Sequence, residues 1–327
     1  MKLVVQIPCY NEAETLPEVL QDIPREIDGI DEVEVLVIDD GSTDDSAAIA
    51  ERSGADKVVR LPVNRGLANA FRVGLEESLR MGADVIVNFD ADHQYRGEDI
   101  PRLIEPVVSG RAGMVVGARN LKSFKPVKRA LERLGSAVVR FVAGTDVLDA
   151  PSGFRAISRE AALKLQVYSS FTYTLETLIQ AGQSGIEVAW VPVETNPPRR
   201  PSRLFSSVWS YLVRSAITIF RITTLYRPLK VFVWISVLVA IPGFLIGLRF
   251  LYYFIFQPER AQGHVQSLIL AAILIILGFQ VAVFGFVADL ISANRRLNEQ
   301  TLYLVKKREL LGSERDSAGS SGSSCES

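Results

Sequence analysis

Two pairs of carboxylates in the sequence each follow a short apolar run. Asp39 and Asp40 follow one run, and Asp90 and Asp92 follow another. If both runs are parallel strands, the carboxylates meet at the carboxyl edge of one sheet, where ligands bind in open α/β folds. Asp90 and Asp92 offer the oxygen ligands that Mg²⁺ and Mn²⁺ prefer, and Gln94 can add a ligand or orient a bound phosphate. Asp-x-Asp alone is common on surfaces, but its place after an apolar strand favours a site for a divalent cation and a diphosphate.

The elements that would position these residues follow from an alternation along the first 190 residues. Short apolar runs are typical of buried strands, and the longer segments between them have helical spacing. This alternation predicts an α/β fold with a mainly parallel, Rossmann-like sheet. We expect strands at 1–8, 33–38, 85–89, 114–116 and 186–191, and helices at 14–27, 45–53, 67–81 and 100–109.

Composition excludes several classes of protein. The 327 residues carry 36 Lys and Arg against 37 Asp and Glu, so the chain has no strongly basic character for binding nucleic acid. Hydrophobic residues make up 48% of the chain, which argues against disorder of the whole molecule. Two cysteines, Cys9 and Cys325, and two histidines are too few for a disulfide scaffold, a zinc ribbon or a histidine-rich metal site.

Two long apolar segments near the carboxyl terminus predict a transmembrane hairpin. Residues 231–256 and 267–291 are each long enough to cross a bilayer. The alternative is a buried hairpin in a soluble core. Five Lys and Arg residues follow the second segment, whereas the loop between the segments carries only Arg260. The positive-inside rule then predicts a multi-pass protein of the cell membrane with both termini and the amino-terminal domain on the cytoplasmic side.

The pattern divides the chain into five parts. Residues 204–228 have amphipathic helical spacing and follow a proline-rich stretch, so we expect a helix at the membrane surface; a helix packed on the domain is the alternative. A Ser- and Gly-rich tail is expected to be disordered. The expected parts are a catalytic domain at 1–203, the interfacial segment at 204–228, the hairpin at 229–294, a cytoplasmic basic helix at 295–311 and the tail at 312–327.

Three motifs, in this order and at these distances, resemble the family 2 glycosyltransferases of GT-A fold. They are Pro-Cys-Tyr-Asn-Glu at 8–12, Asp-Asp-Gly-Ser-Thr-Asp at 39–44 and Asp-Ala-Asp-His-Gln at 90–94. Gly-Ala-Arg-Asn at 117–120 and Asp-Ala-Pro-Ser-Gly-Phe-Arg at 149–155 are similar to the polyprenyl-phosphate branch, which includes dolichol-phosphate mannose synthases. The order Ser152-Gly153 departs from that branch, where glycine usually comes first.

The resemblance implies a role for each matching residue. A nucleotide-sugar pocket would be lined by Pro8, Tyr10, Asn11, Glu12, Asp39, Asp40 and Asp90. The metal would be held by Asp90, Asp92 and Gln94, with Asp92, Asp149 and Arg155 as catalytic residues. The acceptor phosphate would be contacted by Arg119, Arg155, Ser202 and Arg203.

Structural roles remain open for several of these residues. Asp39 and Asp40 can cap a helix, and Arg155 can belong to a structural ion pair. Asp149 can be structural or catalytic, and Arg203 can attract anionic lipid headgroups.

The implied reaction is a metal-dependent, inverting transfer of a hexose, mannose or glucose, from a GDP- or UDP-type donor to dolichyl or undecaprenyl phosphate. The implied cofactor is Mg²⁺ or Mn²⁺, and the partners are the donor, the lipid phosphate and the bilayer, with a homo-oligomer left open. Rival hypotheses are a processive polysaccharide synthase and a non-catalytic module that binds lipid-linked sugar. The first requires a Gln-x-x-Arg-Trp motif, and none of the three tryptophans follows an arginine.

Overall fold

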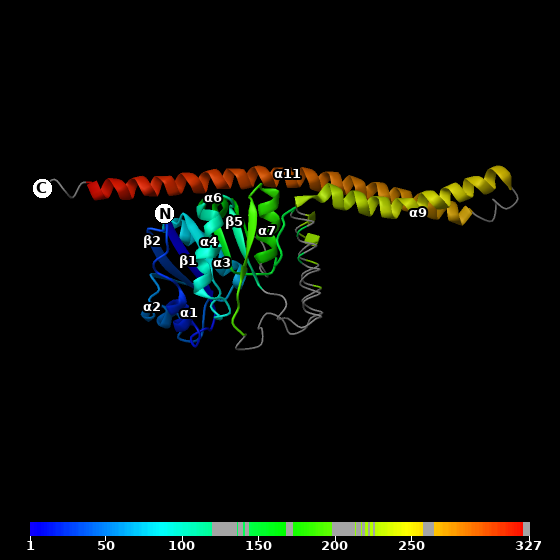
Figure 1. Cartoon of the computed structure of the whole chain (residues 1–327). Helices are drawn as coiled ribbons and strands as arrows, with labels where there is room; N and C mark the ends of the chain where they lie inside the picture. The colour runs from blue at the N-terminus through cyan, green and yellow to red at the C-terminus, as the bar shows by residue number, and fades with distance from the viewer. Residues whose placement is uncertain are drawn as a thin grey trace. The chain divides into compact units, whose positions relative to one another are not determined.

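The amino-terminal part of the chain forms a seven-stranded sheet in the computed structural model (Figure 1). Strand β6 is antiparallel to its neighbours and the others are parallel to one another, which confirms the expected mainly parallel α/β fold. The strands in spatial order are β3 (Lys57–Arg60), β2 (Glu32–Asp39), β1 (Lys2–Cys9), β4 (Val85–Asn88), β6 (Arg155–Ser158), β5 (Met114–Arg119) and β7 (Val188–Val193).

The structure describes most of the chain, with gaps. The described residues are 1–119, 136, 140, 144–167, 173–197, 213, 217, 220, 221, 223, 224, 226–257 and 265–322, with side chains described as far as residue 310. Ser202 and Arg203 lie outside these residues, as does most of the segment 204–228 that we expect at the membrane surface.

Helices cover both faces of the sheet, which explains why its central strands are apolar along their whole length. Helices α1 (Leu16–Asp22), α2 (Ser46–Arg52) and α4 (Ile100–Val108), the last preceded by the short helix η1 (Gly97–Asp99), share one core with the odd-numbered residues of β1. Helix α3 (Leu67–Arg80) lies on the other face, where a Cβ atom at its Gly74 would come within 2.6 Å of Gln6 in β1. Helices α6 (Arg159–Lys164) and α7 (Thr174–Gln183) complete this domain.

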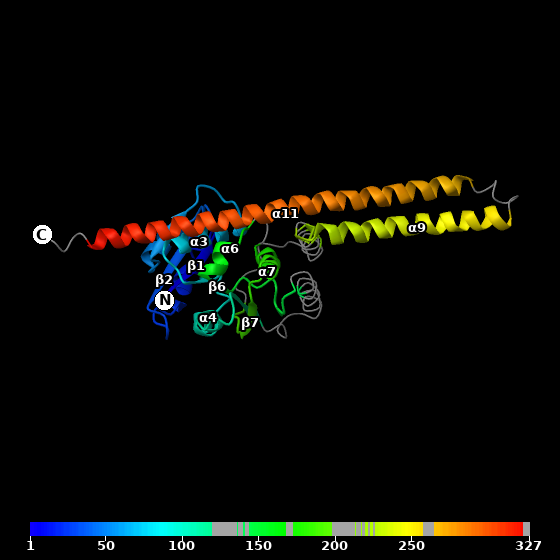
Figure 2. The same cartoon turned by 90° about the horizontal axis from the view of Figure 1, so that it is seen from above.

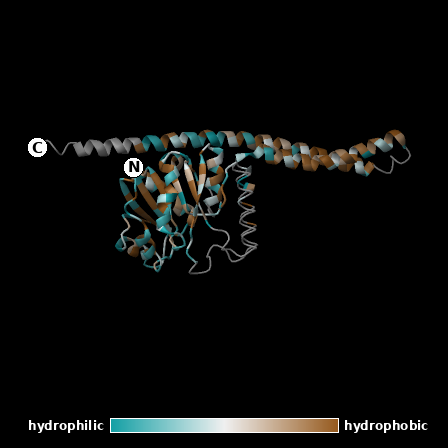
Figure 3. Ribbon diagram, viewed as in Figure 1, coloured by the Kyte–Doolittle hydropathy of each residue, from teal (hydrophilic) through white to brown (hydrophobic). Residues whose placement is uncertain are grey.

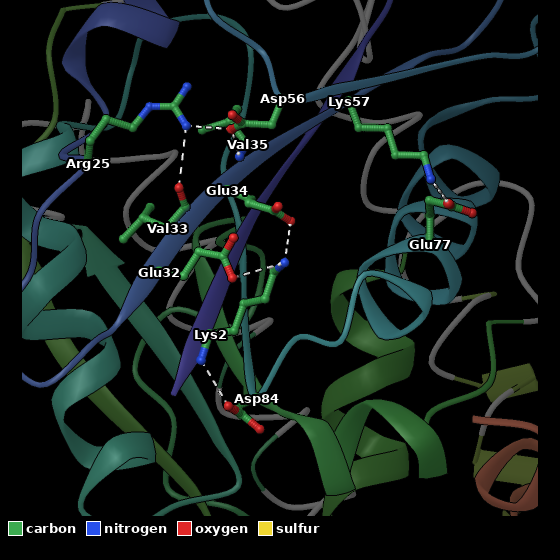
Figure 4. A network of polar contacts seen from close by, with 10 residues as sticks. All are labelled: Lys2, Arg25, Glu32, Val33, Glu34, Val35, Asp56, Lys57, Glu77 and Asp84. Carbon is green, nitrogen blue, oxygen red and sulfur yellow. Dashed lines mark hydrogen bonds and ion pairs between the residues drawn. The ribbon is translucent and has the colours of Figure 1, made fainter. Parts of the chain in front are cut away.

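Ion pairs and side chain–backbone bonds hold the amino edge of the sheet (Figure 4). Lys2 at the start of β1 pairs with Glu32 at 3.2 Å and with Glu34 at 2.8 Å, and its backbone N–H donates to Asp84 at 2.8 Å. Asp56 accepts the backbone N–H of Val35 at 2.7 Å. These contacts join β1 and β2 to the loops before β3 and β4 and leave the opposite edge available for a ligand site.

The carboxyl-terminal part contains two long helices, α9 (Pro228–Phe256) and α11 (Val265–Gly322), which lie side by side (Figures 1 and 2). Small residues let the helices approach closely: a Cβ atom at Gly278 would lie 2.8 Å from Cβ of Ala240, and one at Gly285 would lie 2.5 Å from Cβ of Phe232. The hydroxyl of Ser236 donates to the carbonyl of Gly278 at 2.7 Å. This packing forms the expected helical hairpin.

The paired parts of these helices consist mainly of hydrophobic residues (Figure 3). Many of their large apolar side chains are exposed. Both helices are long and apolar enough to cross a membrane, yet only 6% of the most apolar window of α9 and 17% of that of α11 is buried. Trp234 and Leu238 are each 75% exposed. A hairpin in a soluble core would bury such side chains, so this surface indicates a lipid environment.

Helix α11 continues beyond its apolar half. Contacts between residues divide the whole chain into two units, Met1–Ser215 with Gln300–Ser327 and Ala216–Glu299. The last part of α11 therefore belongs to the first unit. In the first unit the Tyr303 hydroxyl donates to Glu160 of α6 at 2.5 Å, and Lys307 lies 3.5 Å from the same carboxylate. The helix ends at Gly322, so most of the tail that we expected to be disordered is helical. Helices elongate at low cost once formed, and no proline follows Pro258 to stop this one.

Candidate active site

The loops after β1, β2 and β4 meet at the carboxyl edge of the sheet. Strand β1 lies between β2 and β4, and all three are parallel, so the chain leaves each strand at the same edge. Asp39 ends β2, and Asp90 stands two residues beyond the end of β4. The hydroxyl of Thr15, in the loop after β1, donates to the carbonyl of Ala91 at 2.7 Å. The structure therefore places both acidic pairs at one edge.

The first two motifs are bonded to each other. The backbone N–H of Asn11 donates to the Ser42 hydroxyl at 2.9 Å, and the Asn11 side-chain oxygen accepts the backbone N–H of Thr43 at 2.8 Å. Glu12 donates its backbone N–H to the Ser46 hydroxyl at 2.9 Å. These bonds fix the loop that carries Tyr10, whose side chain is 39% exposed, against the loop that follows β2.

Asp39 and Asp40 are buried and bonded to backbone N–H groups. Asp39 accepts the N–H of Ser42 at 3.0 Å, and Asp40 accepts those of Arg65 at 3.0 Å and Gly66 at 2.8 Å. Gly66 is the N-cap of α3, so Asp40 holds the entrance of that helix. Both carboxylates therefore hold backbone segments, but neither is the N-cap residue of α2 or α3, the helix-capping role that the sequence left as an alternative. Pro8 lies buried within β1.

Backbone strain marks two of these loops. Among the residues that the structure describes, Asn11 at φ 54° and His93 at φ 56° are the non-glycine residues with positive φ. This left-handed conformation costs free energy for a residue with a side chain, and such residues cluster at functional sites. One stands in the motif after β1 and the other between Asp92 and Gln94, so both motifs have a strained turn.

Asp90 and Asp92 share a crowded, partly buried space. Burial, together with repulsion by the Asp92 carboxylate, raises the pKa of Asp90 to about 7, and the Arg119 guanidinium offsets part of this rise. Gln94 donates its backbone N–H to Asp92 at 3.1 Å, and its side-chain amide donates to the same carboxylate. The three residues that the sequence assigns to a metal therefore lie together.

These residues fit a divalent cation held jointly with a substrate. No group of three or more His, Cys, Asp or Glu side chains suited to a metal occurs among the described residues. Two carboxylates and an amide leave coordination positions for phosphate oxygens, which is how Mg²⁺ is usually bound at substrate diphosphates. The repulsion that raises the pKa of Asp90 is the kind that a cation between the two carboxylates relieves.

Arg119 and Asp149 form a buried, two-point ion pair. The guanidinium donates to both carboxylate oxygens, at 2.7 and 2.9 Å, and the backbone N–H of Arg119 donates to one of them at 3.1 Å. Asp149 is 1% exposed and Arg119 is 17% exposed. Asp149 therefore holds Arg119 at the end of β5, and the accessible member of the pair is the arginine.

Arg155 lies beneath the site rather than at its surface. It is fully buried and donates to the carbonyls of Ser152 at 2.9 Å and Ala150 at 2.8 Å and to the Thr177 hydroxyl at 2.7 Å. Burial lowers its pKa to about 10, so the guanidinium remains charged at neutral pH. Carbonyl and hydroxyl oxygens of the chain bind this guanidinium, an arrangement that favours a structural role over direct contact with a phosphate. These partners are uncharged, so they differ from the structural ion pair that the sequence left open.

Sequence reasoning missed three residues around Asp90. Asn88 donates through its side-chain nitrogen to the carbonyl of Gly153 and to the Tyr173 hydroxyl, each at 2.9 Å. A Cβ atom at Gly153 would lie 2.7 Å from the Asp90 carboxylate. The sequence offered a signal for Asn88, because it is a polar residue within an apolar run. It offered no comparable signal for Tyr173. The closeness of Gly153 to Asp90 explains why glycine stands in second place in the Ser152-Gly153 pair.

The chain is similar to known proteins in sequence. The model of the family "Glycosyl transferase family 2" matches residues 4–165. The glycosyltransferase AglJ of Haloferax volcanii is 30% identical over 298 residues, which cover 88% of this chain and 93% of the relative. An undecaprenyl-phosphate mannosyltransferase of Micrococcus luteus is 30% identical over 206 residues, which cover 59% of this chain and 83% of the relative.

A solved structure extends the likeness to the fold. Glucosyl-3-phosphoglycerate synthase of Mycobacterium tuberculosis, in complex with Mn²⁺ and UDP-glucose, is 26% identical with a TM-score of 0.52. The match covers 67% of this chain and 78% of that chain. The sheet, the motifs and these relatives agree: the chain belongs to glycosyl transferase family 2 and is a glycosyltransferase.

Proposed function

We propose that this glycosyltransferase moves a hexosyl group, mannosyl or glucosyl, from a GDP- or UDP-type donor to the phosphate of a polyprenyl phosphate. The observation that carries the proposal is the combination of the family 2 motifs at one sheet edge with two long helices in the same chain that are apolar enough to cross a membrane. The name of the Micrococcus luteus relative states undecaprenyl phosphate, which supports this acceptor. The enzyme would act at the cytoplasmic face of the membrane.

The residues of the site take the following proposed roles. The loops carrying Tyr10 and Asp39 would bind the nucleoside. Asp90 and Asp92, with Gln94, would hold Mg²⁺ or Mn²⁺ and through it the donor diphosphate. The Mn²⁺ and UDP-glucose bound by the Mycobacterium tuberculosis synthase support this arrangement. Arg119, held by Asp149, would face the acceptor phosphate, and Ser202 and Arg203 would contact it from a segment outside the described residues.

In this reaction an oxygen of the acceptor phosphate attacks the anomeric carbon. The bond from that carbon to the donor phosphate breaks, the nucleoside diphosphate leaves with the electron pair, and the configuration inverts. A bound cation would supply electrostatic stabilisation of the charge that builds on the leaving diphosphate. A phosphate monoester has its second pKa near 6 and is mostly a dianion at neutral pH, so the acceptor needs no general base. Arg119 orients that dianion through its planar, charged donors.

The proposed transfer to a lipid phosphate explains why the chain carries two helices that can cross a membrane. Each CH₂ group taken from lipid into water costs about 0.8 kcal/mol, so a long polyprenyl chain stays in the bilayer. Only its phosphate reaches the surface. The active site must therefore lie at the headgroup plane, and the hairpin of α9 and α11 would keep it there.

A screen of nucleotide sugars tests the proposal. Purified enzyme in detergent or vesicles is given polyprenyl phosphate, Mg²⁺ or Mn²⁺, and one radiolabelled GDP- or UDP-sugar at a time. We expect one donor to give an organic-soluble product with a single, β-linked sugar. A long polymer would instead identify a processive synthase. Binding of the donor without any product would contradict the transferase reaction.

A further inference from the structure

We propose that Asn88 and Tyr173 are positioning residues that fix the Asp90 carboxylate for its cation. This inference rests on the proposed function, because it assumes that Asp90 serves as a metal ligand. Neither residue belongs to a recognised motif of the sequence. Both are buried: Asn88 ends β4 with its side-chain nitrogen 3.5 Å from the Asp90 carboxylate, and Tyr173, at the N-cap of α7, accepts a hydrogen bond from Asn88.

The orientation of the Asn88 side chain is determined by its neighbours. Its oxygen accepts from the Gln6 amide of β1 at 3.0 Å, so its nitrogen points the other way. On that side lie three acceptors: the carbonyl of Gly153 and the hydroxyl of Tyr173 at 2.9 Å, and the Asp90 carboxylate at 3.5 Å. The opposite rotation of the amide would place its oxygen against the Gly153 carbonyl and the Asp90 carboxylate. Asn88 therefore presents a fixed donor to the base of the site.

Tyr173 is held as firmly as Asn88. Its ring stacks on Phe71 of α3 with the ring centroids 3.8 Å apart and the planes 8° from parallel. A Cβ atom at Gly153 would lie 2.9 Å from the Tyr173 hydroxyl and 2.7 Å from Asp90, so both groups border the same small space. Asn88, Gly153 and Tyr173 together form a wall of the site. Because Gly153 has no side chain, the Asp90 carboxylate can pack against this wall. Such outer partners fix metal ligands in known sites, and their loss typically weakens metal binding about 10–100-fold.

The test is Mn²⁺ binding by the full-length protein, measured as loss of the free Mn²⁺ EPR signal with UDP and, separately, GDP present. Samples without enzyme correct for binding by the nucleotide. Tyr173→Phe removes the hydroxyl and keeps the stacked ring, and Gly153→Ala places a methyl group against Asp90. Gly113→Ala is the matched control, because its Cβ would meet Ile186 at 2.8 Å without touching Asp90. Thermal unfolding of every variant is recorded beside binding.

We expect about 10-fold weaker Mn²⁺ binding for Tyr173→Phe and Gly153→Ala and unchanged binding for Gly113→Ala. The transfer rate of Tyr173→Phe should recover at saturating Mn²⁺, which a loss of folded protein would not allow. Wild-type binding in Tyr173→Phe, with binding lost in Asp92→Ala, would overturn this inference and leave the proposed function intact. Absence of Mn²⁺ binding by the wild type would overturn the metal site itself. If Gly153→Ala fails to fold, Mn²⁺ binding by Tyr173→Phe alone tests the inference.

Discussion

Asp149 and Asp92 are carboxylates of the same site with different surroundings. Asp149 is fully buried and bound at two points by Arg119, whereas Asp92 is partly exposed and bonded by Gln94. Because both oxygens of Asp149 already bind Arg119, this carboxylate is not available to contact a substrate. The geometry indicates that Asp149 positions Arg119, and in the proposed reaction Asp92, not Asp149, would act at the cation.

Replacing each carboxylate separates these roles. Asp92→Ala should lower the transfer rate roughly 10²–10³-fold, because loss of a proposed metal ligand removes electrostatic stabilisation that the cation would give to the leaving diphosphate. Asp149→Asn keeps the shape of the side chain and should leave more activity, with a raised KM for polyprenyl phosphate. Steady-state kinetics on folded variants measures both. Asp31→Ala, an exposed carboxylate at the opposite edge of the sheet, is the control. Equal, complete loss in the first two variants would contradict the base-free scheme.

Cys9 lies buried at the end of β1, and burial raises the pKa of its thiol to about 12. The thiolate is the reactive form, so at pH 8 the reactive fraction is on the order of 10⁻⁴. Iodoacetamide should therefore label folded Cys325→Ser protein very slowly at pH 8. The labelling rate should rise about tenfold with each unit of increase in pH, as long as the pH stays below 12. The same protein in guanidinium chloride serves as the control and should react at once. Rapid labelling of the folded protein at pH 8 would show that Cys9 is accessible.

At the scale of elements, the long regular segments of the fold were predictable. Strands β1, β2 and β4 and helices α3 and α4 lie close to their expected ranges, because apolar runs and helical spacing are strong signals there. Strand β3 was missed because it has four residues with exposed ends. Strand β6 was missed because it begins with Arg155, a charged residue that only tertiary bonds make tolerable in the core.

The candidate site was predictable only in part. The motifs indicated which acidic residues gather at the sheet edge, since that follows from strand direction. They did not show that Asp149 binds Arg119, because these residues lie 30 positions apart in the sequence. They did not show that Arg155 is buried either, because its burial and its bond to Thr177 depend on the packing of β6 in the folded domain. The wall formed by Asn88, Gly153 and Tyr173 is likewise a product of tertiary packing.

The hairpin of α9 and α11 depends on glycines at its contact line. Gly285→Ala would place a Cβ atom 2.5 Å from Phe232, whereas Gly247→Ala would meet only Ala271 at 4.0 Å. Overpacking of this kind costs about 1–3 kcal/mol. We therefore expect Gly285→Ala to unfold at a lower temperature in detergent, measured by circular dichroism, while Gly247→Ala unfolds like the wild type. Equal stability of both variants would contradict the close approach of the helices.

At the scale of the whole molecule, the distribution of basic residues predicts how the chain crosses the membrane. The positive-inside rule places both termini in the cytoplasm and the loop between the spans outside. In intact cells, a membrane-impermeant maleimide should label Gln262→Cys in a Cys325→Ser background. Natural Cys325 should be labelled only after permeabilisation. The reverse pattern would place the active site on the wrong side of the membrane for the proposed donor.

The identity of the acceptor is the central claim, and one measurement tests it most directly. Transfer of radiolabelled sugar by the wild-type enzyme is compared among polyprenyl phosphate, the matching polyprenol and a soluble phosphate monoester, each with EDTA and with Mn²⁺ restored. We predict rapid transfer to polyprenyl phosphate alone, lost with EDTA and regained with Mn²⁺. Equal transfer to the polyprenol, or transfer to polyprenyl phosphate that EDTA leaves unchanged, would contradict the account.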